Sequence, residues 1–133
     1  MNRLKGKIEG INSHGELLLI ELNAQQTKMK AIIIGKPSDD SYLEIGNEIA
    51  ILFKETEVII SSDKILNISA QNKLTCTISS IKKGRLLSQV NLDFNGVNLS
   101  SIITTRSIEN LNLKYHDTVT ALIKTNEIIL SEC

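Results

Sequence analysis

The chain has 133 residues, 41% of them hydrophobic, which is enough for one ordinary domain or two very small ones. Fifteen basic and fifteen acidic residues cancel, so no overall charge draws the protein to nucleic-acid phosphates or anionic lipid. Two tyrosines, two phenylalanines and no tryptophan leave little material for the stacking surfaces of single-stranded nucleic-acid binders.

The cysteines and the apolar segments indicate the cellular compartment of the protein. Cys76 and Cys133 are far apart and form no Cys-x-x-Cys pair, so neither a disulfide framework nor a zinc site is indicated, and a reducing compartment fits. Residues 1–10 lack an apolar segment of signal-peptide length, and the longest aliphatic runs are far too short to span a bilayer. We therefore expect a cytoplasmic protein with no membrane partner.

The first part of the chain alternates between strand patterns and turn residues. Short runs rich in leucine and β-branched residues, with partial alternation, predict five β-strands. These strands are expected over residues 3–11, 16–23, 28–34, 48–54 and 57–61. A polar stretch over residues 37–46 separates the third strand from the fourth.

The second part repeats this order after a linker over residues 62–70. Its strands are expected over residues 73–81, 86–94, 97–104, 118–124 and 127–131. Asn95-Gly96 between two of them is a strong hairpin signal, and residues 107–111 predict a helical turn with Ser107 as its N-cap. Five strands and one short helix in each part indicate an all-β protein built from two OB-like barrels.

The two parts are also similar residue by residue. Most strands align at an offset of seventy residues, as Asn2 does with Asn72. At the first turn the offset changes to sixty-nine, which aligns Gly15 with Gly84. Self-similarity at a fixed period predicts tandem modules. We place the first module at residues 1–66 and the second at residues 67–133.

Three segments of the second module carry a family resemblance. Residues 67–74 read Asn-Ile-Ser-Ala-Gln-Asn-Lys-Leu, similar to an Ile-Ser-Ala-Arg-Asn-x-Leu opening. Residues 101–111 resemble Ser-Ile-Ile-Thr-x-x-Ser-x-x-x-Leu, and residues 119–124 resemble Val-Thr-Ala-x-Ile-Lys. On these motifs the second module resembles a Mop domain of the TOBE group, and two such modules resemble a di-Mop molbindin.

The resemblance implies a cytoplasmic homo-oligomer, a dimer or a trimer, that binds, buffers or stores molybdate or tungstate where modules meet, with no other cofactor. Such tetrahedral dianions only accept hydrogen bonds, so a site needs converging donors. The donor positions of the family map onto Ser69, Gln71, Thr104, Ser107 and Lys124. Gln71 stands where the family has arginine, and losing a charge-assisted bond weakens a site by about 1.5 to 3 kcal/mol.

The first module matches these motifs less well. Gly35 stands where the alignment places the threonine, and the carboxylates of Asp39 and Asp40 after Ser38 should repel a dianion. Ser38 and Lys54 are therefore weaker candidates, and we expect fewer working sites than modules.

Other interpretations stay open. Without the resemblance, the serines and threonines above are ordinary loop residues, and a lysine that ends a strand is usually a solvated charge. No catalytic constellation is suggested, and His14 and His116 lack metal-ligand spacing, so we expect neither an enzyme nor a bound metal cation. The alternative function is an oxyanion-sensing regulatory module that acts on a transporter or a transcription regulator. An OB-type nucleic-acid binder is disfavoured by the zero net charge and the scarce aromatic residues.

Overall fold

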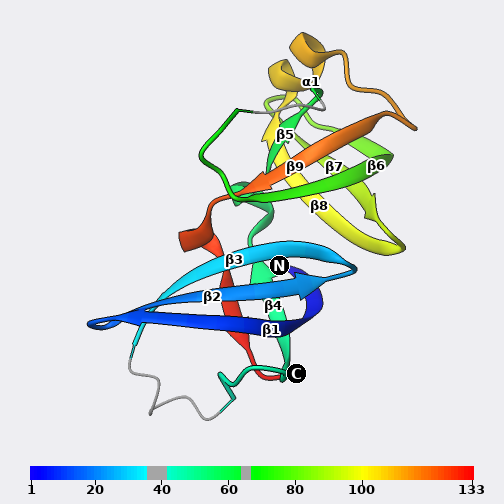
Figure 1. Ribbon diagram of the computed structural model, residues 1–133. Helices are drawn as coiled ribbons and strands as arrows, with labels where there is room; N and C mark the ends of the chain where they lie inside the picture. Colours follow the sequence, from blue (N-terminus) through cyan, green and yellow to red (C-terminus); the bar gives the residue numbers. More distant parts are fainter. Residues whose placement is uncertain (36–41, 64–66) are drawn as a thin grey trace.

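The computed structural model describes residues 1–35, 42–63 and 67–133. Within them, ten strands form two five-stranded sheets (Figure 1). The strands are β1 (Asn2–His14), β2 (Leu17–Ala24), β3 (Thr27–Ile34), β4 (Glu48–Phe53), β5 (Ile59–Ser61), β6 (Asn72–Lys83), β7 (Leu87–Phe94), β8 (Val97–Thr104), β9 (Thr118–Ile123) and β10 (Ile129–Ser131). The helical segments are α1 (Thr105–Leu111) and the short 3₁₀ helices η2 (Glu55–Glu57) and η3 (Thr125–Glu127). The predicted all-β class of two OB-like units is confirmed.

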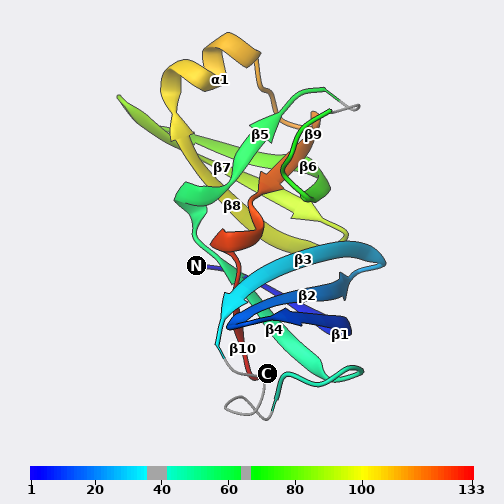
Figure 2. The same ribbon diagram turned by 60° about the vertical axis from the view of Figure 1, so that its left-hand side comes forward.

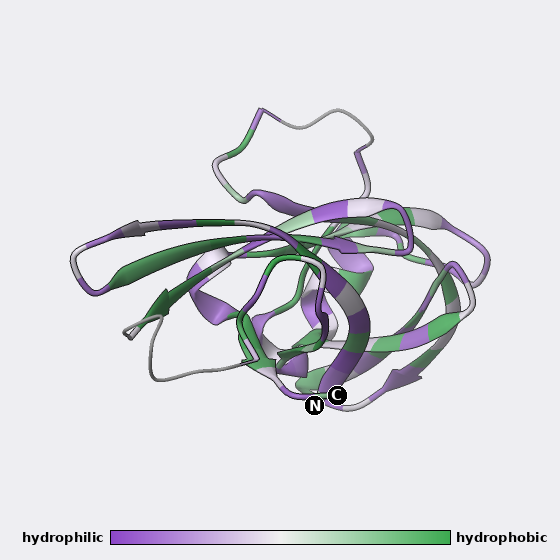
Figure 3. Cartoon of the chain, turned by 60° about the horizontal axis from the view of Figure 1, so that its bottom comes forward, coloured by the Kyte–Doolittle hydropathy of each residue, from purple (hydrophilic) through white to green (hydrophobic). Residues whose placement is uncertain are grey.

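The long strands β1 and β6 organise their sheets. Buried and exposed side chains alternate along the first part of each, so that Leu4 and Ile8 of β1, and Leu74 and Ile78 of β6, point into the core. Figure 3 shows this alternation as changes of colour along the strands. A register irregularity follows Ile8 and again Ile78. Such bulges bend a strand, so the first part of β1 or β6 pairs with one neighbour and the second part with another.

The two halves of the chain exchange their last strands. In the first sheet the order is β10-β4-β1-β2-β3, and in the second it is β5-β9-β6-β7-β8. Strand β5 pairs antiparallel with β9, and β10 pairs antiparallel with β4, as Figures 1 and 2 show. The module boundary at residues 66 and 67 stays a prediction about the sequence repeat, but neither sheet is made from five consecutive strands.

Two buried asparagines join the sheets. The Asn72 side chain accepts a hydrogen bond from the Lys30 backbone N–H at 2.7 Å and donates one to the Lys30 carbonyl at 2.9 Å. Asn2 makes the same pair of bonds with the backbone of Ser100, both at 2.8 Å. Each side chain therefore satisfies the outer edge of β3 or β8, much as a neighbouring strand does.

Two sequence-based expectations are wrong in detail. Helix α1 begins at Thr105, not at Ser107, and Thr104 is its N-cap. The repeat also keeps its offset of seventy through the turn, because Gly35 N–H donates to the Glu16 carbonyl as Thr105 N–H donates to the Leu86 carbonyl. The structural counterpart of Thr104 is therefore Ile34, not Gly35.

Candidate functional site

Thr104 and Ser107 bring two hydroxyl groups together where β8 leads into α1. Their oxygen atoms are 2.8 Å apart, and Thr104 Oγ1 also accepts a hydrogen bond from the Ser107 backbone N–H at 3.2 Å. Thr104 is exposed and Ser107 is half-buried. The spacing of three residues places both hydroxyls on one side of the first helical turn, where an anion in solvent can reach them.

A second threonine fixes this corner of the molecule. The Thr105 hydroxyl donates to the Gly84 carbonyl at 2.9 Å and lies 2.7 Å from the Ser88 hydroxyl. Gly84 belongs to the turn between β6 and β7, so these buried bonds tie the start of α1 to that turn. The positions on both sides of Thr105 are held against a rigid support.

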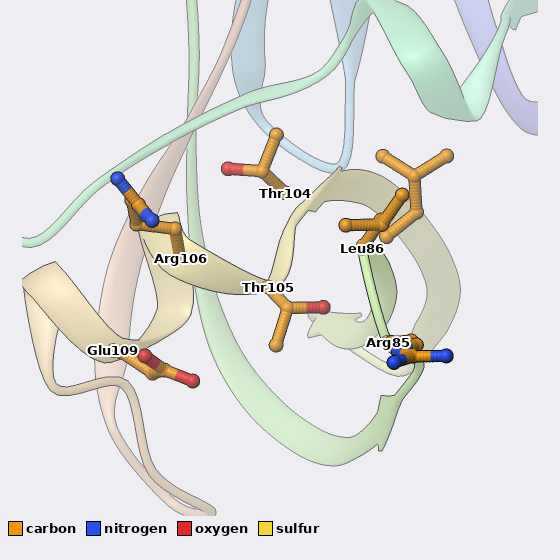
Figure 4. Close-up of a pocket in the computed structure, with 7 residues that line it drawn as sticks. Arg85, Leu86, Thr104, Thr105, Arg106 and Glu109 are labelled. Atoms are coloured by element: carbon orange, nitrogen blue, oxygen red, sulfur yellow. The ribbon is translucent and has the colours of Figure 1, made fainter.

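A groove of about 640 Å³ opens at this corner. Thr104, Thr105, Arg106 and Glu109 line one side, and the turn that carries Arg85 with Leu86 and Leu87 lines the other (Figure 4). Sequence reasoning missed both arginines. Arg106 stands inside the Thr-x-x-Ser motif, so a search of the variable motif positions for cations would have found it.

The other sequence-predicted donors lie elsewhere. Gln71 precedes β6 and Lys124 follows β9, and the pairing of Asn72 with Ile123 makes them neighbours at the end of the second sheet that faces the first sheet. Ser69 lies in the segment that leads into this end. We call it the junction end, and all three residues are exposed there.

These two groups do not meet within one chain. Thr104 pairs with Leu87 beside the C-terminal end of β6, whereas Gln71 lies just before its N-terminus. Figures 1 and 2 both show α1 and the end of β9 at opposite ends of the second sheet. We call the end with α1 the helix end. Within one chain, the sequence-predicted donors therefore form two separate groups.

The comparisons identify the family. Residues 68–130 match the TOBE domain model. Molybdenum-pterin-binding protein 1 of Clostridium pasteurianum is 35% identical over 66 residues, which is 49% of this chain and 97% of that protein. The chain belongs to the molbindin family. This assignment agrees with the resemblance found in the second half.

Two further proteins match nearly the full length of this molbindin, one in sequence and one in structure. The molybdenum transport protein ModE of Azotobacter vinelandii is 24% identical over 132 residues, and the chain spans about half, 49%, of its length. A crystal structure of ModG, described as a cytoplasmic molybdate-binding protein and solved with molybdate bound, superposes with a TM-score of 0.92. The superposition covers 99% of this chain and 96% of that chain at 24% identity, so it shows a common fold.

Among the described residues of the first half, the position that matches Thr104 carries no hydroxyl group. Ile34, the counterpart of Thr104, has 77% of its surface exposed and offers no donor side chain. Lys54 is exposed at the position equivalent to Lys124, next to η2. Ser38 lies outside the described residues.

Among the described residues, no group of three or more His, Cys, Asp or Glu side chains is placed to hold a metal ion. No helix in this part of the chain has the length and apolar character needed to cross a membrane. Cys76 is buried, and this burial, helped by the charge of Asp93, raises the pKa of its thiol to about 12.

Proposed function

We propose that this molbindin binds a tetrahedral oxyanion, molybdate or tungstate, in the cytoplasm and so buffers or stores it. The observation that carries the proposal is the hydroxyl pair of Thr104 and Ser107, 2.8 Å apart beside an open groove. Only one hydroxyl of the pair can donate to the other, and both can rotate to donate to an anion instead. Bonds to a charged acceptor are stronger than the neutral bond they replace.

The names of the relatives support the choice of ligand. The Clostridium protein is named for molybdenum-pterin binding, and ModG is described as molybdate-binding. Both names describe binding, and we propose binding without a catalytic step for this chain as well.

We further propose that two or three copies of the chain assemble to complete the site. The junction end carries Ser69, Gln71 and Lys124, and the helix end carries Thr104 and Ser107, at opposite ends of one sheet. Contact between the helix end of one copy and the junction end of another adds the Lys124 ammonium to the two hydroxyls. A charge-assisted donor then balances part of the dianion's charge.

Calorimetry on the full chain tests the function. We expect heat of binding with molybdate and tungstate, and a loss of about tenfold or more in affinity for Ser107→Ala, because a hydrogen bond to a charged group contributes about 1.5 to 3 kcal/mol. Ser13→Ala, at an exposed position of β1, is the matched control and should bind as the native chain does. Native mass spectrometry with each anion gives the number of chains and of bound ions. Absence of heat with molybdate, tungstate, sulfate and phosphate would overturn the proposal.

The similarity to ModE over 98% of this chain favours one second candidate, an oxyanion-sensing module that acts on another protein. This role predicts a partner that co-purifies with the chain in ligand-free extract and dissociates when molybdate is added. A chain that stays free of partners in both conditions supports storage instead.

A further inference from the structure

Arginine is scarce in this chain and unevenly placed. The sequence contains three arginines, Arg3, Arg85 and Arg106. Two of the three line the groove beside Thr104, although they come from different elements, the turn before β7 and the first turn of α1. In Figure 4 the Thr104 hydroxyl lies on the side of the groove toward Arg106, and Arg85 lies across it beside the leucines.

Neither groove arginine has a partner in the described part of the chain. The ion pairs found there involve the Met1 ammonium with Glu55 and Lys5 with Glu48, and no hydrogen bond uses either guanidinium. Glu109 lines the same groove, three residues after Arg106, yet forms no ion pair with it. With respect to the residues that the structure describes, both guanidinium groups thus keep all their donors for a ligand.

The place of Arg106 in α1 does not serve the helix. The partial positive charge at a helix N-terminus favours acidic side chains in the first turn and disfavours basic ones. The first turn of α1 contains no acidic residue and does contain Arg106. Helix stability therefore gives no reason for a cation at this position.

The two halves differ in charge in the same sense. Residues 1–66 contain eight basic and ten acidic residues, and residues 67–133 contain seven and five. The end of β6 and the turn that follows it, residues 82–86, carry Lys82, Lys83 and Arg85, whereas the equivalent residues 12–16 of the first half include no lysine or arginine and end in Glu16. Arg85 and Arg106 line the groove, and Lys82 and Lys83 lie nearby at the end of β6, so basic residues gather at the helix end, where the local potential attracts anions.

We propose that Arg106 binds the oxyanion directly together with Thr104 and Ser107, and that Arg85 raises the positive potential from the opposite wall. This inference rests on the proposed oxyanion function and names two residues that supply positive charge in addition to Lys124. A guanidinium offers paired donors to two oxygens of one tetrahedral anion, which a lysine ammonium does not. The groove is lined by two positive side chains, Arg85 and Arg106, and by one negative side chain, Glu109. The charge of its lining is therefore positive.

Titration of molybdate into three arginine-to-glutamine variants tests this assignment. Arg106→Gln should lose about tenfold or more in affinity, because it removes a charge-assisted bond. Arg85→Gln should lose less, about two- to fivefold, and the loss should shrink as salt screens the potential. Arg3→Gln makes the same charge change on the first sheet and should bind as the native chain does.

Arg106→Lys separates charge from geometry, since it keeps the positive charge and loses the paired donors. We expect it to bind more weakly than the native chain and more tightly than Arg106→Gln. Urea unfolding of each variant checks the fold, and Arg106→Gln should be no less stable than the native chain, because it removes a cation from a helix start.

The outcomes separate the two proposals. A native chain that binds no oxyanion would sink the proposed function and this inference together. If the native chain binds molybdate and Arg106→Gln binds it equally well, the oxyanion function stands and the role of Arg106 is wrong.

Discussion

Thr104 shows how one residue serves both the fold and the proposed site. Its oxygen caps α1 through the Ser107 N–H, and its hydroxyl pairs with that of Ser107. The family resemblance implied that these two residues act together, and the first turn of α1 brings their hydroxyl oxygens to 2.8 Å. The resemblance did not predict the place of Lys124, because which end of a curved sheet a residue reaches depends on strand pairing rather than on local spacing.

The two cysteines should differ sharply in reactivity. Cys76 is buried with a thiol pKa of about 12, whereas Cys133 is exposed. Because the thiolate is the reactive form, a thiol reagent at neutral pH should label one cysteine in the folded chain and two in urea. Mass spectrometry of the labelled peptides checks this, and rapid labelling of Cys76 in the folded chain would contradict it.

The same thiol should make the fold sensitive to alkali. Its pKa is higher in the folded chain than the ordinary value of 9.0, so the folded state favours the neutral thiol. The contribution to stability is fully present below about pH 9 and is lost as the pH rises toward 12. A Cys76→Ala variant should lose this part of the pH dependence.

At the scale of elements, strand positions could be predicted closely and strand partners could not. Alternation placed β8 at residues 97–104, as observed, and most other strands within two residues. The predicted slip at Gly15 was wrong because a residue match misled it. Gly15 and Leu17-Leu18 match Gly84 and Leu86-Leu87 at an offset of sixty-nine, whereas at seventy only Leu17 matches Leu87. The strand pairs decide between them, since Leu17 faces Ile34 as Leu87 faces Thr104.

The asparagine bridges are contacts between elements whose loss should be measurable. Asn72→Ala leaves the Lys30 N–H and carbonyl without their partners at the edge of β3. We expect a loss of about 1 to 3 kcal/mol in the free energy of unfolding, measured with urea. Asn2→Ala should show a similar loss through Ser100. Asn126→Ala, at an exposed site in η3, is the control. An equal loss of unfolding free energy in this variant would contradict the stabilising role of the two buried asparagines.

At the scale of the whole molecule, the strand exchange determines what holds the halves together. Strand β5 hydrogen-bonds β9, and β10 hydrogen-bonds β4, so each sheet needs residues from the other half. The sequence could not show this, because the two last strands have nearly the same pattern, Glu-Val-Ile-Ile-Ser and Glu-Ile-Ile-Leu-Ser, and fit either sheet. In the structure, the chain passes through η2 to place β5 in the second sheet, and through η3 to place β10 in the first sheet.

Cleavage of the linker tests this architecture. A protease recognition sequence is inserted between Asn67 and Ile68, which are both exposed. Cleavage there cuts the chain into two fragments outside the strands of both sheets. The two fragments should elute together on gel filtration and separate only in denaturant, because each retains a strand in the other's sheet. Elution of two folded, independent fragments would contradict the exchange.

The exchange of last strands also gives the first repeat a structural role in the second sheet, although the two repeats differ at the groove. The first repeat presents Ile34 where the second presents Thr104, yet it supplies β5, whose Ile60 is buried in the sheet that carries the hydroxyl pair. The second repeat supplies β10 in return. Loss of either repeat would therefore remove a strand from the sheet of the other, so the groove at Thr104 depends on a repeat that contributes no residue to its lining.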